Sequence, residues 1–276
     1  MIVDAHQHFW TLARGDYPWP NETVAPIFRD FGPEDLAPLL VQSDVDRTVL
    51  VQATDTIEET EFLLQIAAKT DWVAGVVGWV DLSADDAISI IDTLLKNRDL
   101  KGLRPMLQNI ENTDWILDDR VAPALTHMAR VGLCFDALVQ PRHLLVLTEL
   151  AKRHPSLKIV IDHAAKPQMG AGKIPSKDWS NGMRQLSRCS NVLCKLSGMV
   201  TEIGPDWRLS DIEPFAKQIL ENFGAARTMF GSDWPVVNLA SDYAQWRGAV
   251  DQLLKGLTDA DRSRVLGLNA MEFYKL

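Results

Sequence analysis

Short runs of apolar and β-branched residues alternate along the chain with longer segments in which apolar residues recur every three or four positions. Runs of the first kind are typical of strands buried on both faces of a parallel sheet, and segments of the second kind indicate amphipathic helices. The pattern predicts eight strands: Ile2–Ala5, Arg47–Ala53, Val73–Val80, Leu100–Met106, Gly132–Val139, Lys158–His163, Asn191–Leu196 and Thr228–Gly231.

Several of the intervening helices have recognisable starts. Thr56 is followed three residues later by Glu59, and Ser210 by Glu213, which is the pattern of a capping box. Pro141 fits the first position of a helix. A last helix is expected from about Asp259 to the end of the chain.

Eight strands alternating with helices over 276 residues predict an α/β fold, a single-domain (β/α)8 TIM barrel spanning residues 1–276. A doubly wound open sheet is the alternative, but no glycine-rich dinucleotide fingerprint follows the first strand. The longest irregular stretches, Phe9–Phe31 and Ala165–Ser180, are expected to be extended loops after strands 1 and 6. In a barrel such loops lie at the carboxyl ends of the strands, where function is concentrated.

The charge distribution argues against partners with a strong negative charge. The net charge is −9 and the lysines and arginines are scattered, so we expect neither nucleic acid nor membrane as a partner. No apolar run approaches the roughly 20 residues of a membrane span, and the first strand has no basic leader before it. The three cysteines follow no metal or disulfide spacing. These features favour a cytoplasmic protein; the oligomeric state stays open.

His6 and His8 are two positions apart at the end of the first predicted strand. Side chains at this spacing point to the same face, with Asp4 behind them. Two converging imidazoles can bind a metal, polarise a substrate or move protons. The alternative is that they are simply polar residues at the start of a loop.

Polar side chains also occur at the ends of other predicted strands: Arg104, Asp136, Asp162, His163, Lys195 and Asp233. Barrel enzymes place their catalytic groups at these strand ends. Lys195 lies in a strand buried on both faces, so we expect it to point into the barrel mouth and meet an anion or a carbonyl, with a salt bridge at the rim as the alternative. Arg104 is expected to clamp an anion. Asp136 and Asp162 are expected to be structural.

The segments Val3–Trp10, Ile161–His163 and Gly231–Pro235 resemble the amidohydrolase superfamily. Asp16–Pro20 and Lys195–Gly198 resemble more narrowly its lactonase-rich branch, which includes sugar-acid lactonases and pyrone-dicarboxylate lactonase. The resemblance covers the whole chain, because its landmarks occur at the first, sixth, seventh and eighth strands in the right order.

The chain departs from the metal-dependent pattern at two strand ends. Metal-dependent members commonly carry a lysine after strand four and a histidine after strand five, where this chain has Arg104 and Leu138–Gln140. A two-metal site is therefore not expected. The resemblance leaves His6, His8, His163 and Asp233 for one divalent ion, zinc, with a water in an open position. Members of the branch that work without metal leave metal-independent catalysis equally open.

The resemblance implies a hydrolase that opens the cyclic ester of a sugar-acid lactone, an aldonolactone such as L-fuconolactone, in carbohydrate catabolism. Asp233 is the expected general base, with a pKa tuned towards neutral by desolvation. His6, His8 and His163 would stabilise the oxyanion, and Arg104 and Lys195 would orient the substrate. Three aromatic residues, Trp10, Tyr17 and Trp19, would stack on the sugar ring; packing within the loop is the alternative for them.

Other functions fit the same landmarks. A non-oxidative decarboxylase, or a hydrolase of pyrones or muconolactone, belongs to the same superfamily. A catalytically silent barrel that serves as a binding protein is a further alternative. Retention of the histidine pair together with His163 and Asp233 argues against a silent barrel, since loss of activity would not spare all four.

Overall fold

The computed structural model describes residues 1–276 and contains one eight-stranded parallel sheet in the order β1 to β8. The strands are β1 (Val3–Gln7), β2 (Arg47–Val51), β3 (Val73–Gly78), β4 (Leu100–Leu103), β5 (Cys134–Ala137), β6 (Ile159–Ile161), β7 (Val192–Leu196) and β8 (Thr228–Phe230). All eight predicted strands are present and in order. Most end earlier than predicted, whereas β1 extends two residues beyond Ala5 and includes His6, because Gln7 pairs with Leu50 of β2.

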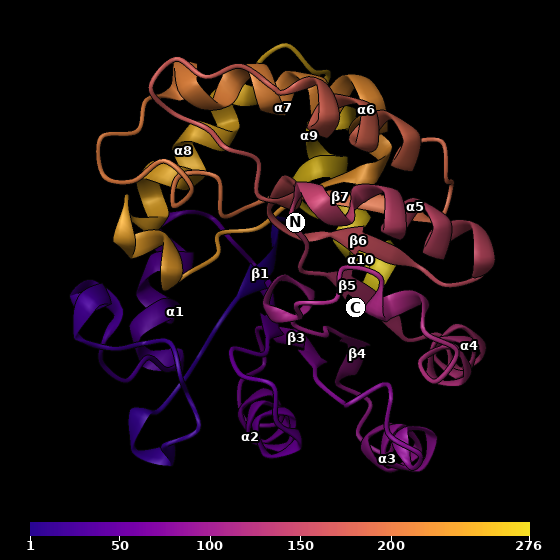
Figure 1. The fold of residues 1–276 in the computed structure, drawn as a ribbon. Helices are drawn as coiled ribbons and strands as arrows, with labels where there is room; N and C mark the ends of the chain where they lie inside the picture. Colours follow the sequence, from indigo (N-terminus) through magenta and orange to yellow (C-terminus); the bar gives the residue numbers. More distant parts are fainter.

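Helices surround the strands in chain order (Figure 1). They are α1 (Pro33–Gln42), α2 (Ile57–Ala67), α3 (Ala87–Leu94), α4 (Ala122–Val131), α5 (Leu144–Arg153), α6 (Lys177–Leu186), α7 (Leu209–Phe223), α8 (Tyr243–Leu253), α9 (Asp259–Ser263) and α10 (Asn269–Tyr274). The predicted (β/α)8 barrel is confirmed. None of these helices is both long and apolar enough to cross a lipid bilayer.

Local sequence explains where the helices begin. The Thr56 hydroxyl accepts a hydrogen bond from the Glu59 N–H and caps α2, which confirms one half of the predicted capping box; the Glu59 carboxylate accepts the Ala53 N–H instead of that of Thr56. The prediction for Ser210 is wrong, because α7 already begins at Leu209. Its first turn is capped instead by Asp211, whose carboxylate accepts the N–H of Arg208 at 3.1 Å.

The barrel closes between β1 and the segment that follows β8. The His8 N–H donates to the Trp234 carbonyl at 2.7 Å, and the Asp233 N–H donates to the His6 carbonyl at 2.8 Å. Buried Asp4 reinforces this seam, since its carboxylate accepts the Ser232 N–H at 2.8 Å. The closure therefore fixes the position of Asp233 relative to His6 in β1 and to His8 directly after it.

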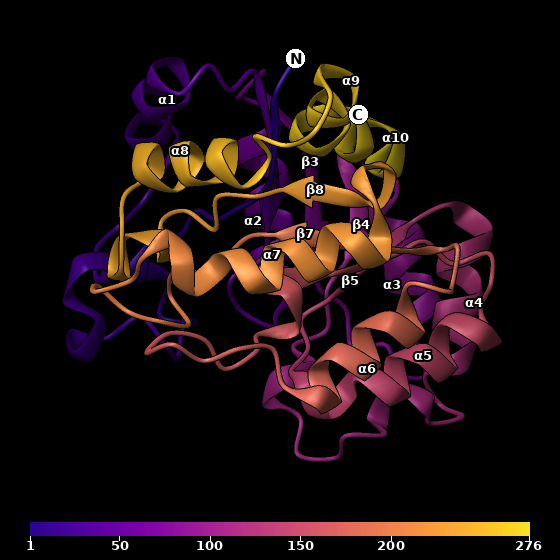
Figure 2. The ribbon, with the colours of Figure 1, turned by 90° about the horizontal axis from the view of Figure 1, so that it is seen from above.

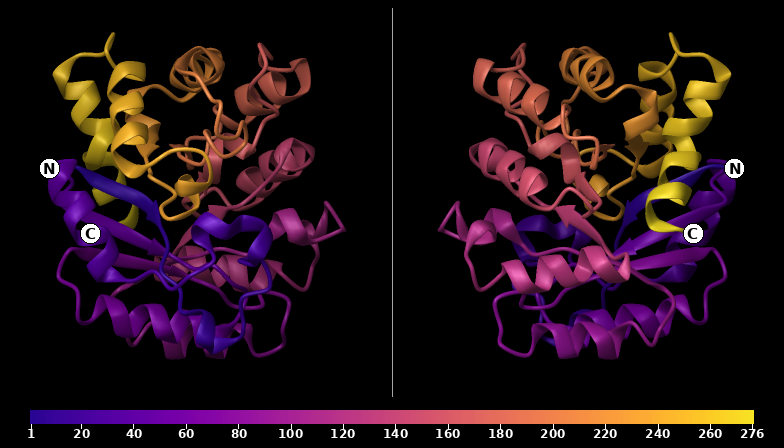
Figure 3. Two further views of the ribbon diagram at one scale, coloured as in Figure 1. Left: turned by 90° about the vertical axis from the view of Figure 1, so that its left-hand side faces the viewer. Right: turned by 90° about the vertical axis from the view of Figure 1, so that its right-hand side faces the viewer.

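Two apolar clusters hold the barrel together. A cluster of 64 buried residues lies largely between the strands and the surrounding helices, and a smaller one of 11 residues joins strand residues to Ala270, Phe273 and Tyr274 of α10. Both chain termini lie at the same end of the barrel as α9 and α10 (Figures 2 and 3). The amino ends of the strands are thus sealed by α10, which leaves the carboxyl ends for a site.

Candidate active site

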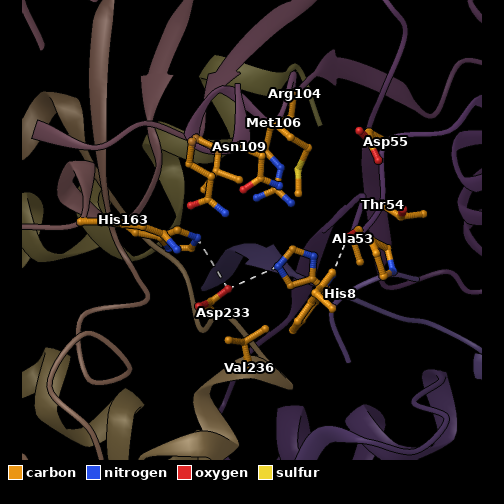
Figure 4. A pocket seen from close by; sticks show the side chains of 15 residues that line it. His8, Ala53, Thr54, Asp55, Arg104, Met106, Asn109, His163, Asp233 and Val236 are labelled. Carbon is orange, nitrogen blue, oxygen red and sulfur yellow. Dashed lines mark hydrogen bonds and ion pairs between the residues drawn. The ribbon is translucent and has the colours of Figure 1, made fainter. Parts of the chain in front are cut away.

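A cavity of about 250 Å³ opens at the carboxyl ends of the strands. This volume lies at the small end for ligand pockets and suits a ligand of about one sugar ring. Its polar lining comes from loops that follow five different strands: His8, Thr54, Asp55, Arg104, Gln108, Asn109, His163, Lys166 and Asp233. Pro18, Trp19, Ala53, Met106, Leu138 and Val236 supply the apolar walls. Figure 4 shows Asp233 between His8 and His163 in this cavity.

His6, His8 and Asp233 bring three metal-binding atoms together. His6 Nε2 lies 3.2 Å from His8 Nε2, and Asp233 Oδ1 lies 3.3 Å from His8 Nε2 and 3.7 Å from His6 Nε2. His8 Nδ1 lies 2.8 Å from the Val51 carbonyl, which can only accept a hydrogen bond. The Nδ1 atom must therefore carry a proton, and in the neutral ring Nε2 keeps its lone pair directed at the cluster.

The spacing of these three atoms fits a single ion of the size of zinc. Zinc–ligand bonds of about 2.1 Å in tetrahedral geometry place ligand atoms roughly 3.4 Å apart. The three atoms are mutually within 4.8 Å and all three residues are buried. His163 is not among these three residues, and its role as a fourth ligand stays a prediction. An open position would be left for water or substrate.

His163 instead lies beside the cluster. Its Nε2 is 3.7 Å from Asp233 Oδ1, and its Nδ1 is 2.9 Å from the Ser197 hydroxyl. Burial lowers the pKa of His163 to about 4 and that of His6 well below its usual value. Both rings are therefore neutral at pH 7, each with one N–H donor and one acceptor nitrogen.

Arg104 lines the cavity and brings a fixed positive charge to the cluster. One of its terminal nitrogens lies 3.3 Å from His6 Nε2 and 3.5 Å from the Asp162 carboxylate. The other donates to the Gln52 carbonyl, while the Gln52 side chain donates to the Arg104 carbonyl at 2.8 Å. This reciprocal pair holds the guanidinium at the floor of the cavity.

The structure corrects the prediction for Lys195. Its side chain is fully buried and absent from the cavity lining, and its ammonium lies 2.6 Å from Asp136 and 2.9 Å from Asp162. Although burial lowers the pKa of Lys195, the two carboxylates outweigh burial and raise it. A charge in the barrel interior needs such partners, because water does not reach it. The expectation that both aspartates are structural agrees with these contacts.

The prediction that the pKa of Asp233 is raised towards neutral is also wrong. Burial alone would raise it, but His163, the hydrogen bond with His8 and the proximity of His6 outweigh burial and hold the pKa below the usual value. Asp233 is consequently ionised at neutral pH. It is available to accept a proton, as a weaker base than predicted.

Of the three aromatic residues predicted to face the substrate, only Trp19 lines the cavity. Its indole N–H donates to the Ala53 carbonyl at 2.8 Å, which fixes the ring against the loop after β2. Trp10 is completely buried, and the Tyr17 hydroxyl donates to Glu59 at 2.5 Å. Packing of the loop therefore explains Trp10 and Tyr17.

Sequence reasoning missed several residues of the site. Lys166 and Asp55 line the cavity, and buried Glu59 holds Tyr17 together with the Ala53 N–H. Lys166 follows His163 by three residues, which is a signal that could have identified it. The sequence pattern marks Glu59 only as part of a capping box, and nothing in it distinguishes Asp55 from an ordinary charged residue near a helix start.

A barrel with two histidines from its first strand, a histidine after the sixth and an aspartate after the eighth defines a hydrolase-type barrel with a candidate single-metal site. The sequence model of the amidohydrolase family (Amidohydro_2) matches residues 3–276, and the chain belongs to this family. The family predicted from the strand-end motifs is thereby confirmed.

Similar proteins share nearly the full length of the chain. It is 47% identical to an L-fucono-1,5-lactonase of Burkholderia ambifaria, covering 99% of this chain and 95% of that protein. It is 34% identical to an L-fucono-1,5-lactonase of Burkholderia multivorans, covering 99% and 96%. A crystal structure of a Burkholderia multivorans amidohydrolase with bound zinc superimposes with a TM-score of 0.93 at 33% identity, covering 100% and 99%.

Proposed function

We propose that this protein is a lactonase that hydrolyses the cyclic ester of a sugar-acid lactone, an aldonolactone such as L-fucono-1,5-lactone. The observation that carries the proposal is the cluster of His6, His8 and Asp233, in which His8 and Asp233 line a cavity sized for one sugar ring and His6 is buried behind them. Full-length similarity to two L-fucono-1,5-lactonases supports the same reaction.

Asp233 is the general base in this proposal. Its carboxylate is ionised, lines the cavity and lies beside three imidazoles. It takes a proton from water as the water oxygen bonds to the lactone carbonyl carbon. When the bond between this carbon and the ring oxygen breaks, the same proton passes to the ring oxygen, and the product is a hydroxy acid.

The developing oxyanion needs donors that are already in place. The Arg104 guanidinium is held by Gln52 and Asp162, so it offers positive charge at the cavity floor without rearrangement. The neutral His163 ring adds a second polar group, on the side of Asp233 that lies opposite His8 (Figure 4). A zinc ion, when bound by His6, His8 and Asp233, would polarise the carbonyl and lower the pKa of a bound water.

The direct test is hydrolysis of a panel of six-carbon, deoxy and pentose aldonolactones by the purified protein. Acid release is followed with a pH indicator, corrected for spontaneous hydrolysis, and the hydroxy acid is identified by NMR. The Asp233→Asn variant serves as the matched inactive control. Lack of turnover with every aldonolactone would overturn the proposal.

The same panel addresses the other reactions. Pyrone and muconolactone substrates are included, and candidate aromatic and muconate-type acids are assayed for release of carbon dioxide. Turnover of an aldonolactone with no carbon dioxide from the acids is the expected result. Saturable binding of a lactone without turnover would instead indicate a binding protein.

A further inference from the structure

The segment after β6 has an unusual backbone. Four consecutive residues that are not glycine have positive φ angles: His163 at 51°, Ala164 at 52°, Ala165 at 61° and Lys166 at 47°. Residues other than glycine adopt this conformation rarely, and then as single residues rather than as runs. A run of four persists only where the surroundings fix it, and such strain concentrates at functional sites.

Contacts from two neighbouring elements fix this left-handed turn. The Trp179 indole N–H, from α6, donates to the Ala164 carbonyl at 2.8 Å, and the Ser197 hydroxyl after β7 holds His163 Nδ1 at 2.9 Å. Gly198 packs so closely that a Cβ atom there would lie 2.4 Å from His163 Nδ1. The turn thereby places the side chains of both His163 and Lys166 on the cavity wall.

Lys166 reaches the cavity with most of its hydrogen-bonding capacity unused. Its ammonium forms one ion pair, with Glu202 Oε1 at 3.5 Å. Both side chains are about a quarter exposed, at 25% and 27%. An ammonium carries three donors, so at least two of them are free for a ligand in the cavity.

The neighbouring charge indicates which ligand group this ammonium suits. Glu202 offsets the positive charge of Lys166, so the pair presents a donor without a net charge. The carboxylate of the product forms at the carbonyl carbon, next to Asp233. A neutral hydroxyl group on the sugar ring therefore matches the Lys166 donor better than an anion does.

We propose that Lys166 is a specificity-determining residue whose ammonium donates a hydrogen bond to a hydroxyl group of the lactone ring. This inference rests on the proposed function. Lys166 binds the substrate but takes no part in proton transfer, so its loss affects KM more than kcat. A hydrogen bond from a charged donor corresponds to about a 10- to 100-fold effect on kcat/KM.

The experiment compares wild type, Lys166→Met and Lys166→Arg with the best aldonolactone and with its monodeoxy analogues. Lys217→Met, on the exposed face of α7, is the control for loss of a lysine. For Lys166→Met we expect kcat/KM to fall about 10- to 100-fold with the parent lactone, mainly through KM. With the monodeoxy analogue that lacks the hydroxyl bound by Lys166, the kcat/KM values of this variant and of wild type should be nearly equal. Lys166→Arg should recover part of the loss.

Three outcomes would overturn the role of Lys166. The first is an unchanged KM in Lys166→Met, and the second is an equal loss with the parent lactone and every deoxy analogue. The third is relief of inhibition by the hydroxy-acid product without a change in lactone KM, which would assign Lys166 to the carboxylate. Failure of wild type to turn over any aldonolactone would instead overturn the proposed function itself.

Discussion

The ammonium of Lys195 lies 2.6 Å from the carboxylate of Asp136, with both side chains completely buried. Asp162 completes the group on the side of His6, and the Tyr274 hydroxyl of α10 donates to Asp136 at 2.7 Å. Lys195, Asp136 and Asp162 thus form an ionic layer inside the barrel. It lies between the apolar cluster that includes residues of α10 and the histidines of the site.

Replacing Lys195 by Met should destabilise the protein, because it leaves two buried carboxylates without their shared cation. Breaking a buried pair costs about 3–5 kcal/mol. Urea denaturation followed by tryptophan fluorescence measures the loss. Lys158→Met, which removes a partly exposed lysine from the amino end of the barrel, is the control. A Lys195→Met variant as stable as wild type would show that the ionic layer contributes little.

Asp233→Asn should lower kcat by roughly 10²- to 10⁴-fold with the fold intact, since the amide cannot accept the proton from water. Steady-state kinetics and circular dichroism check the two parts of this prediction. Asp85→Asn, which changes an exposed carboxylate outside the cavity, is the matched control. Near wild-type turnover by Asp233→Asn would mean that another group is the base.

Any metal in this protein should be a single ion at the site of His6, His8 and Asp233. Elemental analysis of protein produced with zinc should find at most one equivalent per chain, and the double variant His6→Ala, His8→Ala should lose it. His154→Ala, remote from the cluster, should keep it. Two equivalents per chain would contradict the prediction.

The stability of the protein should carry a pH dependence that arises from Glu59. Burial raises the pKa of Glu59 to about 7, although the hydrogen bonds from Tyr17 and Ala53 and the charge of Arg14 oppose it. Between about pH 4.5 and pH 7 the folded protein holds a proton that the unfolded chain releases. The free energy of unfolding therefore decreases as the pH rises through this window, by up to about 3 kcal/mol.

Glu59→Gln should remove this part of the pH dependence. Asp4, whose pKa burial raises to about 6, contributes in the same direction in both proteins, so the difference between them isolates Glu59. Urea midpoints of wild type and variant, measured from pH 4.5 to pH 8, provide the comparison. Parallel curves for the two proteins would show that Glu59 does not titrate in this range.

Much of the barrel follows from the sequence alone. Runs such as Arg47–Ala53 and Val73–Val80 are short and rich in β-branched residues, which is typical of buried parallel strands, and their alternation with amphipathic helices leaves few topologies. The spacing of His6 and His8 placed both on one face of β1, because side-chain direction on a strand alternates with every residue. The motif Gly231–Pro235 indicates that Asp233, after the last strand, belongs to the same site.

What the sequence could not determine were distances between segments far apart in the chain. Lys195 was expected at the mouth of the barrel, whereas Asp136 and Asp162 bind it in the interior. Whether a charge faces water or a partner depends on the neighbouring strands, which a single strand does not encode. For the same reason, only the folded loops showed that Trp19 rather than Trp10 or Tyr17 forms the cavity wall, and that a left-handed turn carries Lys166 to it. The sequence by itself determined the strands, their order and the residues at their ends; the tertiary structure decided which of those residues meet, because their contacts depend on packing across the barrel.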